Sequence, residues 1–354
     1  MQFKSRPGEA GMTEKGIWKI KKIADDPHLK LLITGTSGFI GGFLVEEAIK
    51  RGYHVVAGVR KTSNRIIHPS VSFIELDYEK PDSIAKSLEK ENFKFVIHNA
   101  GLTQGRQEKD YFLSNYLYTR NLVDAFLKTD CPPEKFIYTS SLASYGPGKT
   151  SLAPIQPSDK QSPITFYGKS KLEAENYLRS ITTLPYLILR PTAVYGPRER
   201  NLFLLFNLLN RHIELKLVKN RQVLSFVYLK DLVDCFFKAL ESDLKQKSYF
   251  VSDGNSYTAE KLSSTIKEHL NKKTIKITVP DFILKPAAGV SEVIARITGS
   301  FPVFNTDRLQ ELKSVNWSCN IDETIADLKY APKYNLDQGI AETIKWYKEN
   351  GWLK

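Results

Sequence analysis

Short apolar runs and longer periodic stretches alternate along the first half of this chain. Residues 31–34 form an apolar run, residues 39–50 carry apolar side chains every three to four positions, and a second run follows at 54–59. Such runs predict buried strands, and the periodic spacing predicts a helix. The alternation continues with runs at 71–76, 95–98, 136–139 and 187–189 and with periodic stretches at 83–88, 112–128 and 167–178. This order predicts an α/β fold, a Rossmann-type doubly wound parallel sheet with helices on both faces.

The second half of the chain is richer in helical patterns. A strand at 223–228, a helix at 229–241 and a strand at 249–251 are predicted to return to the sheet. Further helices are predicted at 201–212, 258–270, 281–297, 321–329 and 337–350.

These patterns divide the chain into three parts. We expect a Rossmann domain at 29–195, with 222–253 returning to it. A smaller, mainly helical substrate-binding lobe is expected at 196–221 and 254–354. Residues 1–28 are polar and basic and predict an N-terminal extension, within which Met1 and Met12 are both candidate starts.

The segment 281–300 combines helical periodicity with many large apolar residues, among them Phe282, Val290 and Ile297. Three interpretations are open. The segment is a helix that faces the core, a cover over an apolar substrate, or a contact with a membrane surface.

Three glycines follow the first apolar run with the spacing G-x-x-G-x-x-G. Gly35, Gly38 and Gly41 lie between the first predicted strand and the first predicted helix. Glycine suits unusual turn dihedrals, a close approach of the backbone to a pyrophosphate, and tight packing of a helix on a strand. Because a helix N-terminus presents free amide groups to anions, the sequence predicts a dinucleotide phosphate site here.

The residues after the second predicted strand bear on the choice of cofactor. An acidic residue there would bind the ribose 2′-hydroxyl, whereas a cation accommodates a 2′-phosphate. Val59 is followed by Arg60 and Lys61, and Asn64 and Arg65 add further donors. The alternative is a solvated surface pair, but the local chemistry favours NADP(H) over NAD(H).

Polar residues also follow other predicted strands, at the ends that border the ligand crevice of a parallel sheet. Asp77 follows the third strand, Asn99-Ala100-Gly101 the fourth and Ser140-Ser141 the fifth. Asp77 has two interpretations, an acceptor for an adenine amino group or a cap of the next helix. Residues 146–162, rich in Pro, Gly, Ser and Lys, predict a loop long enough to act as a lid.

The spacing Tyr-x-x-x-Lys occurs at residues 145–149, 167–171 and 257–261. Glycine and proline disfavour a helix at the first position, and the third lies outside the predicted sheet. The pair Tyr167 and Lys171 lies in a predicted helix after a crevice strand, and residues four apart project from one helical face.

This pair has a plausible chemistry. A tyrosine hydroxyl, with an ordinary pKa of about 10, is a poor base at neutral pH unless a nearby ammonium group stabilises the phenolate. Lys171 supplies that charge. A hydroxyl from Ser141 would hold a substrate oxygen while Tyr167 exchanges its proton and the carbon exchanges a hydride with nicotinamide. The alternative for Ser141 is an ordinary strand-end turn serine.

With these motifs in place, the chain resembles the extended short-chain dehydrogenases/reductases, the NAD(P)-dependent epimerase/dehydratase family, over residues 29–253. The matching motifs are Thr34-Gly35-x-x-Gly38-Phe39-Ile40-Gly41, Asp77, Asn99-Ala100-Gly101, Asn115, Ser140-Ser141-x-x-x-Tyr145-Gly146, Tyr167-Gly168-Lys169-Ser170-Lys171, Arg190-Pro191-x-x-x-Tyr195-Gly196-Pro197 and Phe226-Val227-Tyr228-x-x-Asp231.

The resemblance implies a site. Ser141, Tyr167 and Lys171 match the family's catalytic trio, Lys171 would also bind the nicotinamide ribose, and Asn115 matches an asparagine near the active site. The implied cofactor-binding residues are Thr34, Gly35, Ser37, Gly38, Phe39, Ile40, Gly41, Arg60, Lys61, Asp77, Tyr78, Asn99, Ala100, Gly101, Tyr167, Lys171, Arg190 and Pro191. No metal is implied.

Two kinds of observation indicate the branch of the family: positions where this sequence departs from the family pattern, and segments that resemble one branch. Ala193 stands where nucleotide-sugar epimerases usually have an asparagine that contacts substrate, and Tyr118 replaces a common glycine. The residues around Arg60, the segment 190–197 and the ending 346–353 look more like 3-beta-hydroxysteroid dehydrogenases and dihydroflavonol-4-reductases. We therefore expect reversible hydride transfer at a carbonyl or secondary alcohol of a small, moderately hydrophobic substrate. The alternatives are a nucleotide-sugar epimerase or dehydratase that retains its cofactor, and a catalytically silent NAD(P)-binding sensor.

Composition adds few constraints. The 354 residues carry a formal net charge of +12, but the lysines are scattered and no nucleic-acid-binding motif is present, so no nucleic acid partner is expected. Three widely spaced cysteines support neither a disulfide framework nor a metal site and favour the reducing cytoplasm. No apolar run is long enough to cross a bilayer. The family resemblance implies a homodimer.

Overall fold

The computed structural model describes residues 29–62, 68–150, 153–217, 222–298, 302 and 304–353. The predicted extension at 1–28 and the donors Asn64 and Arg65 lie outside the described residues. The first predicted unit is present, as β1 (Lys30–Thr34), α2 (Phe39–Lys50) and β2 (His54–Val59).

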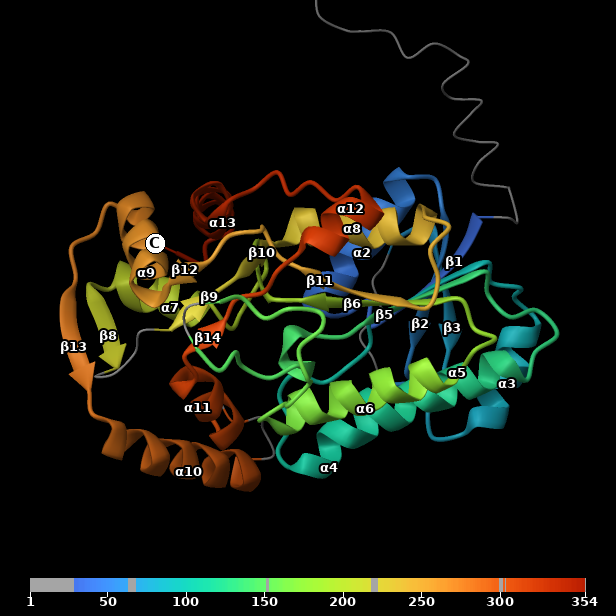
Figure 1. The fold of residues 1–354 in the computed structure, drawn as a ribbon, viewed down its shortest axis with the longest axis horizontal. Coiled ribbons are helices and arrows are strands. Elements are labelled where there is room, and N and C mark those ends of the chain that lie inside the picture. The colour runs from blue at the N-terminus through green and yellow to red at the C-terminus, as the bar shows by residue number, and fades with distance from the viewer. Residues whose placement is uncertain are drawn as a thin grey trace, which may run out of the picture.

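A seven-stranded parallel sheet forms the centre of the molecule, in the order β11-β6-β5-β4-β1-β2-β3 (Figure 1). Its other strands are β3 (Val71–Glu75), β4 (Phe95–His98), β5 (Lys135–Thr139), β6 (Tyr186–Pro191) and β11 (Lys247–Val251). The strand order reverses between β1 and β4, where Thr34 pairs with Gly58 on one side and with His98 on the other. Parallel sheets bind ligands outside the strand ends at such a switch point.

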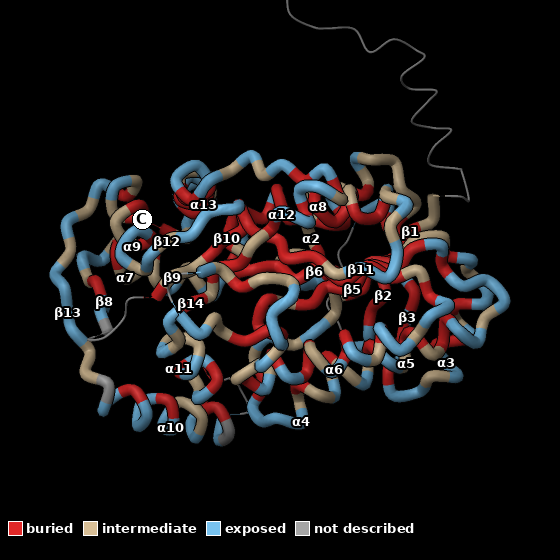
Figure 2. The backbone as a smooth tube through the Cα atoms, viewed as in Figure 1, coloured by how far each residue is buried: buried red, intermediate tan, exposed pale blue. Residues whose placement is uncertain are grey.

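Helices cover both faces of the sheet, which confirms the predicted fold class. The helices α3 (Pro81–Glu89), α5 (Tyr118–Leu127) and α6 (Phe166–Ser180) pack on the face of Leu32 and Val56. On the other face, Leu31 and Ile33 pack with α2, α8 (Leu229–Glu241) and α12 (Asp322–Leu328) (Figure 1). Figure 2 shows that buried residues concentrate in the sheet between these two layers. The strands are therefore continuous apolar runs because both their faces are covered.

A smaller lobe packs around aromatic residues such as Tyr195, Phe206 and Tyr347. It contains α7 (Phe203–Asn210), α9 (Ala259–Leu270) and α13 (Leu336–Glu349), with α10 (Asp281–Thr298) and α11 (Thr306–Lys313) leading back toward α6. Its strands are β7 (Ala193–Tyr195) with β10 (Phe226–Tyr228), β8 (Ile213–Leu217) with β13 (Ile275–Val279), and β9 (Val223–Leu224) between β12 (Tyr257–Thr258) and β14 (Asn316–Trp317).

Two predictions from the pattern were wrong in detail. Residues 223–228 do not return to the central sheet, because Ser225 separates two short strands that pair within the smaller lobe. The return is made by α8 and β11, and later in the chain α12 also packs on the sheet. The stretch 112–128 is not one regular helix. After α4 (Glu108–Tyr111), residues Phe112–Leu117 form a π-helical segment before α5. The spacing of apolar residues does not show with which strand a strand pairs. It also does not show that a helical turn contains one extra residue.

Among the described residues, no helix has the length and apolar character needed to cross a bilayer.

Candidate active site

The glycine turn after β1 has the geometry that its sequence predicts. Gly35 adopts a φ of +70°, and a Cβ there would lie 2.7 Å from the backbone of Asn99 and Ala100. A Cβ on Gly41 would lie 2.1 Å from the carbonyl oxygen of Gly35, so α2 packs directly on the turn. Both positions therefore require glycine, one for its dihedrals and one for close packing.

The N-terminus of α2 faces a large cavity. Gly38 is the N-cap and provides no side-chain acceptor for the amide groups of the first helical turn, which contains no acidic residue. Gly38 also lines the cavity. Free amide groups and the helix dipole make this end of α2 suited to an anion such as a pyrophosphate.

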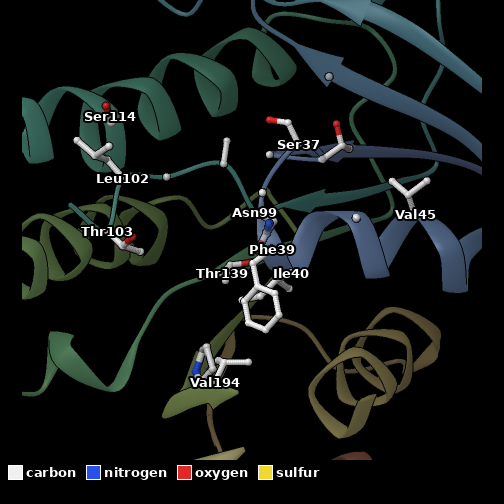
Figure 3. A pocket seen from close by; sticks show the side chains of 18 of the residues that line it. Ser37, Phe39, Ile40, Val45, Asn99, Leu102, Thr103, Ser114, Thr139 and Val194 are labelled. Carbon is white, nitrogen blue, oxygen red and sulfur yellow. The ribbon is translucent and has the colours of Figure 1, made fainter. Parts of the chain in front are cut away.

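The cavity has a volume of about 1360 Å³, larger than the roughly 300–1,000 Å³ of ordinary small-molecule pockets. It extends from Arg60 at the end of β2, past the glycine turn, to Tyr167 and Lys171. Figure 3 shows Phe39 and Ile40 at the start of α2 together with Asn99, Thr139 and Val194 around one space. The size and length of the cavity suit a dinucleotide with a second ligand beside it.

Most of the predicted site residues meet in this cavity. Those that line it are Gly35, Ser37, Gly38, Phe39, Ile40, Arg60, Tyr78, Asn99, Ala100, Gly101, Ser141, Tyr167, Lys171 and Pro191. The predicted residues outside its lining are Thr34, Gly41, Lys61, Asp77, Asn115 and Arg190.

Arg190 forms a buried ion pair with Glu175. Its Nε and Nη2 donate to the two carboxylate oxygens of Glu175, at 2.9 and 2.8 Å. The guanidinium also lies over the ring of Tyr145, at 5.0 Å. Burial opposes ionisation of Glu175, yet Arg190 holds the pKa of this carboxyl below its ordinary value. Arg190 therefore ties β6 to α6.

Asn115 likewise acts within the protein framework. Its Oδ1 accepts from the backbone N–H of Leu102 at 2.7 Å, and its Nδ2 donates to the carbonyl of Leu102 and to Ser170 Oγ. These bonds connect the π-helical segment to the loop after β4 and to α6. Asn115 thus fixes the backbone near Gly101, which does line the cavity.

The other residues outside the lining also have local partners. Thr34 Oγ1 accepts from the backbone N–H of Ala100 at 3.0 Å. Asp77 Oδ1 accepts from the N–H of Glu79 at 3.2 Å, and Lys80 lies 3.3 Å from Asp77 Oδ2. The helix that follows is capped at Lys80, so Asp77 stabilises the preceding turn instead of capping the helix. Lys61 is exposed.

Tyr167 lies in the first turn of α6, which closely approaches the turn that follows β5. The approach depends on Gly168, because a Cβ there would lie 2.2 Å from the carbonyl oxygen of Ala143. Thr165 caps the helix by accepting from the N–H of Gly168 at 3.0 Å. Tyr167 and Ser141 line the same cavity, and Ser141 also acts on the pKa of Tyr167. The structure therefore brings the two predicted hydroxyl residues to one site.

The electrostatics of Tyr167 and Lys171 differ from the simple expectation. Burial raises the pKa of Tyr167 to about 12, and its hydrogen bond with Ser141 opposes that shift. Burial lowers the pKa of Lys171 to about 7. Lys171 Nζ donates to the carbonyl of Thr139 at 2.7 Å and lies 4.8 Å from the ring centre of Tyr138. Desolvation thus favours the neutral form of both groups, and the opposing hydrogen bond to Tyr167 comes from Ser141.

Thr139, which the sequence analysis did not single out, lines the same part of the cavity. Its Oγ1 is buried and has no hydrogen-bond partner within the part of the chain that the structure describes. Buried polar groups are nearly always paired, so this hydroxyl suits a polar group of a ligand. Its position directly before Ser140-Ser141 at the end of β5 was the available signal.

The loop Arg198–Asn201 from the smaller lobe closes the other side of the cavity and was also missed. Arg198 Nη1 donates to Glu46 of α2 at 2.8 Å, and the guanidinium lies 4.5 Å from the ring centre of Phe43. Gln104 donates to Asn201 at 2.8 Å. The sequence Pro-Arg-Glu-Arg after Gly196 was its signal, but it did not show which lobe the charges face.

Comparison with known proteins gives a match over most of the chain. A family model described as the NAD dependent epimerase/dehydratase family matches residues 31–252. A UDP-glucose 4-epimerase of Vibrio cholerae is 26% identical over 337 residues, which cover 89% of this chain and 94% of the epimerase. A ceramide reductase of Caulobacter vibrioides is 25% identical over 345 residues, 94% of this chain and 98% of the reductase.

Solved structures show the same fold. The dTDP-glucose 4,6-dehydratase of Bacillus anthracis in complex with NAD superposes with a TM-score of 0.73, at 18% identity, covering 92% of this chain and 98% of the dehydratase.

Proposed function

The chain belongs to the NAD dependent epimerase/dehydratase family, and from this premise we propose that it is an NAD(P)-dependent oxidoreductase. It transfers a hydride reversibly at a carbonyl or secondary alcohol of a small substrate. The observation that carries the proposal is that Ser141, Tyr167 and Lys171 line one cavity with the glycine turn before α2. Its relatives include an epimerase and a reductase, so both outcomes belong to this family.

The residues present fit a dinucleotide. The amide groups at the start of α2 would hold the pyrophosphate, and Tyr78 and Arg60 would border the adenosine half. Lys171 would bind the nicotinamide ribose, beside the buried hydroxyl of Thr139. When bound, the cofactor supplies the hydride or accepts it.

The chain's own residues handle the proton. Ser141 Oγ would hold the substrate oxygen, and Tyr167 Oη would give its proton to that oxygen during reduction or remove it during oxidation. Because the pKa of Tyr167 is raised to about 12, its hydroxyl is protonated at neutral pH and ready to donate. Charging Lys171 would stabilise the phenolate left after donation.

We propose NADP(H) as the preferred cofactor, with NAD(H) as the alternative. Arg60 lines the cavity at the end of β2, and no carboxylate follows that strand in the described residues up to Thr62. A guanidinium suits a ribose 2′-phosphate, while an acidic residue would suit a free 2′-hydroxyl.

We also propose a homodimer formed through the α5 and α6 side of the molecule. Leu113, Leu117, Leu127 and Phe166 are exposed on or next to these helices. Light scattering after size-exclusion chromatography measures the oligomeric state directly, and a monomer at all concentrations would refute the proposed dimer.

The decisive experiment is the variant Tyr167→Phe with Tyr177→Phe as its control on the same helix. Turnover is followed by absorbance of the reduced cofactor in a screen of carbonyl compounds and sugar nucleotides. Tyr167→Phe should abolish turnover while fluorescence titration shows unchanged cofactor affinity, and Tyr177→Phe should remain active. Full activity in Tyr167→Phe refutes the mechanism. Conversion of a sugar nucleotide without net cofactor consumption would favour the epimerase alternative.

A further inference from the structure

An apolar surface on the smaller lobe lies outside the site described above. It consists of Phe282, Ile283, Val290, Val293, Ile294 and Ile297, and we call it the α10 face. Phe282 is 77% exposed and Ile297 is 79% exposed, and the other four side chains are between 45% and 59% exposed. At 3.6 residues per turn these positions fall within roughly a third of the helix circumference. They therefore form one contiguous stripe.

The helix has a second apolar face that is buried. Leu284, Ala288 and Ala295 are buried, and α10 packs on α11. Ser291 also accepts from the N–H of Phe304, in the segment before α11, at 3.2 Å. The interpretation of α10 as a purely core-facing helix thus accounts for one face only. None of its described residues lines the cavity, so the exposed face is not explained by the site described above.

The strand that precedes α10 also carries exposed apolar side chains. Ile275 and Ile277 of β13 pair in register with Ile213 and Leu215 of β8, so these four side chains lie on one face of the two-stranded ladder. Ile275 is 73% exposed, and Ile277 and Leu215 are about half exposed. Figure 1 shows β13 and α10 following each other along the outer edge of the smaller lobe.

Basic residues accompany this surface. Residues 272–298 contain five basic and two acidic residues. Lys273, Lys276 and Lys285 are exposed, whereas the carboxylate of Glu292 accepts from the N–H and hydroxyl of Thr306. A helix with a broad apolar face and flanking cations is suited to lie in the interface of an anionic bilayer.

We propose that the α10 face docks this protein on the surface of a membrane that contains anionic phospholipid. The apolar side chains enter the acyl boundary, and the lysines bind phosphate headgroups. The charge distribution favours this occupant over a second copy of the chain. A symmetric contact through this face would bring the same lysines of two molecules together, in a protein whose net charge is already +12.

The test is co-sedimentation of the full chain with two vesicle types, phosphatidylcholine alone and phosphatidylcholine mixed with phosphatidylglycerol. The wild-type protein should bind the mixed vesicles and bind them less as salt increases. Ile294→Glu/Ile297→Glu should reduce binding at least tenfold. Ile325→Glu is the matched control, since Ile325 is 44% exposed on α12 at a distance from α10, and it should bind as the wild type does.

A second variant tests the contribution of the lysines to binding of anionic headgroups. Lys273→Gln/Lys276→Gln/Lys285→Gln should lose about tenfold in binding to the mixed vesicles. The exposed lysines Lys90, Lys345 and Lys348, changed together to glutamine, are its control. Thermal melting verifies that each variant is folded.

Several outcomes would overturn the proposal. These are no binding of the wild type to either vesicle, equal binding to both, and unchanged binding of the Ile294→Glu/Ile297→Glu protein. A concentration-dependent dimer that this variant abolishes would instead assign the face to contact between copies.

Discussion

The carboxylate of Asp307 accepts a hydrogen bond from the backbone N–H of Tyr167, across 140 positions of sequence and at 3.3 Å. Asp307 is buried in the first turn of α11, in the segment that leads back from α10, and Tyr167 lies in the first turn of α6. A carboxylate at a helix N-terminus binds free amide groups and complements the helix dipole. The smaller lobe thus holds the start of the helix that carries the proposed proton donor.

This contact makes Asp307 a positioning residue. Asp307→Ala should lower kcat about fivefold, which corresponds to about 1 kcal/mol for a lost helix cap. Cofactor affinity should be unchanged, because Asp307 does not line the cavity. Asp307→Asn keeps an oxygen acceptor and should restore most of the rate, an outcome that a purely structural defect would not give. Asp337→Ala, in the first turn of α13, is the control.

Arg60 and Lys61 give a paired test of cofactor choice. Arg60→Asp removes the cation that lines the cavity and introduces an acceptor for a ribose hydroxyl, so the ratio of kcat/KM for NADPH over NADH should fall at least tenfold. Lys61→Asp should change the ratio much less, because Lys61 is exposed and outside the lining. A wild-type preference for NADH, or equal effects of the two changes, would contradict the proposed role of Arg60.

Lys171 predicts a pH-dependent stability. Its pKa is lowered by burial from 10.5 to about 7, so between these values the unfolded chain binds a proton that the folded chain does not. The folded state therefore gains stability from this group as pH rises from 7 to 10.5 and loses it as pH falls. Lys171→Met should stabilise the protein most near pH 7, with the advantage shrinking toward pH 10.

Chemical denaturation at several pH values measures that difference. Lys169→Met is the control, since Lys169 is exposed on the same helix. A constant difference between wild type and Lys171→Met across this range would refute the lowered pKa.

Glu175 is predicted to be a centre of stability. It is fully buried and accepts from Arg190, Arg179, Gln161, Ser144 and Ser140. Glu175→Gln leaves the guanidinium of Arg190 buried without its counter-charge, which should cost roughly 3–5 kcal/mol of unfolding free energy. Glu173→Gln, exposed on the same helix, should cost almost nothing. A melting temperature that is the same for both variants would show that the ion pair is dispensable.

Local pattern was enough for much of the fold. The alternation of apolar runs and helical periods predicted the strands and helices of the central sheet, because burial on both faces leaves a continuous apolar signature. The spacing of Gly35, Gly38 and Gly41 predicted the turn before α2, since its backbone demands no side chain. The spacing of Tyr167 and Lys171 placed both on one side of a helix.

Other site features could not be read in this way. Arg190 lies near the end of a crevice strand, β6, as a cofactor ligand would, yet its guanidinium pairs with Glu175 in the core. Thr139, Arg198 and Asp307 carry no motif of their own. Thr139 ends β5 in the central sheet, whereas the positions of Arg198 and Asp307 depend on how the smaller lobe packs against the sheet.

The sequence by itself determined most of the strands and helices of the central sheet, where the backbone must be glycine, and which two side chains share one side of a helix. All of these depend on residues within a few positions of one another. The tertiary structure decided that β9 and β10 pair outside the central sheet, that Asp307 binds Tyr167, and that one apolar face of α10 is left exposed. The sequence shows that an apolar or charged side chain needs a partner. Which residue becomes that partner is decided only when the whole chain packs.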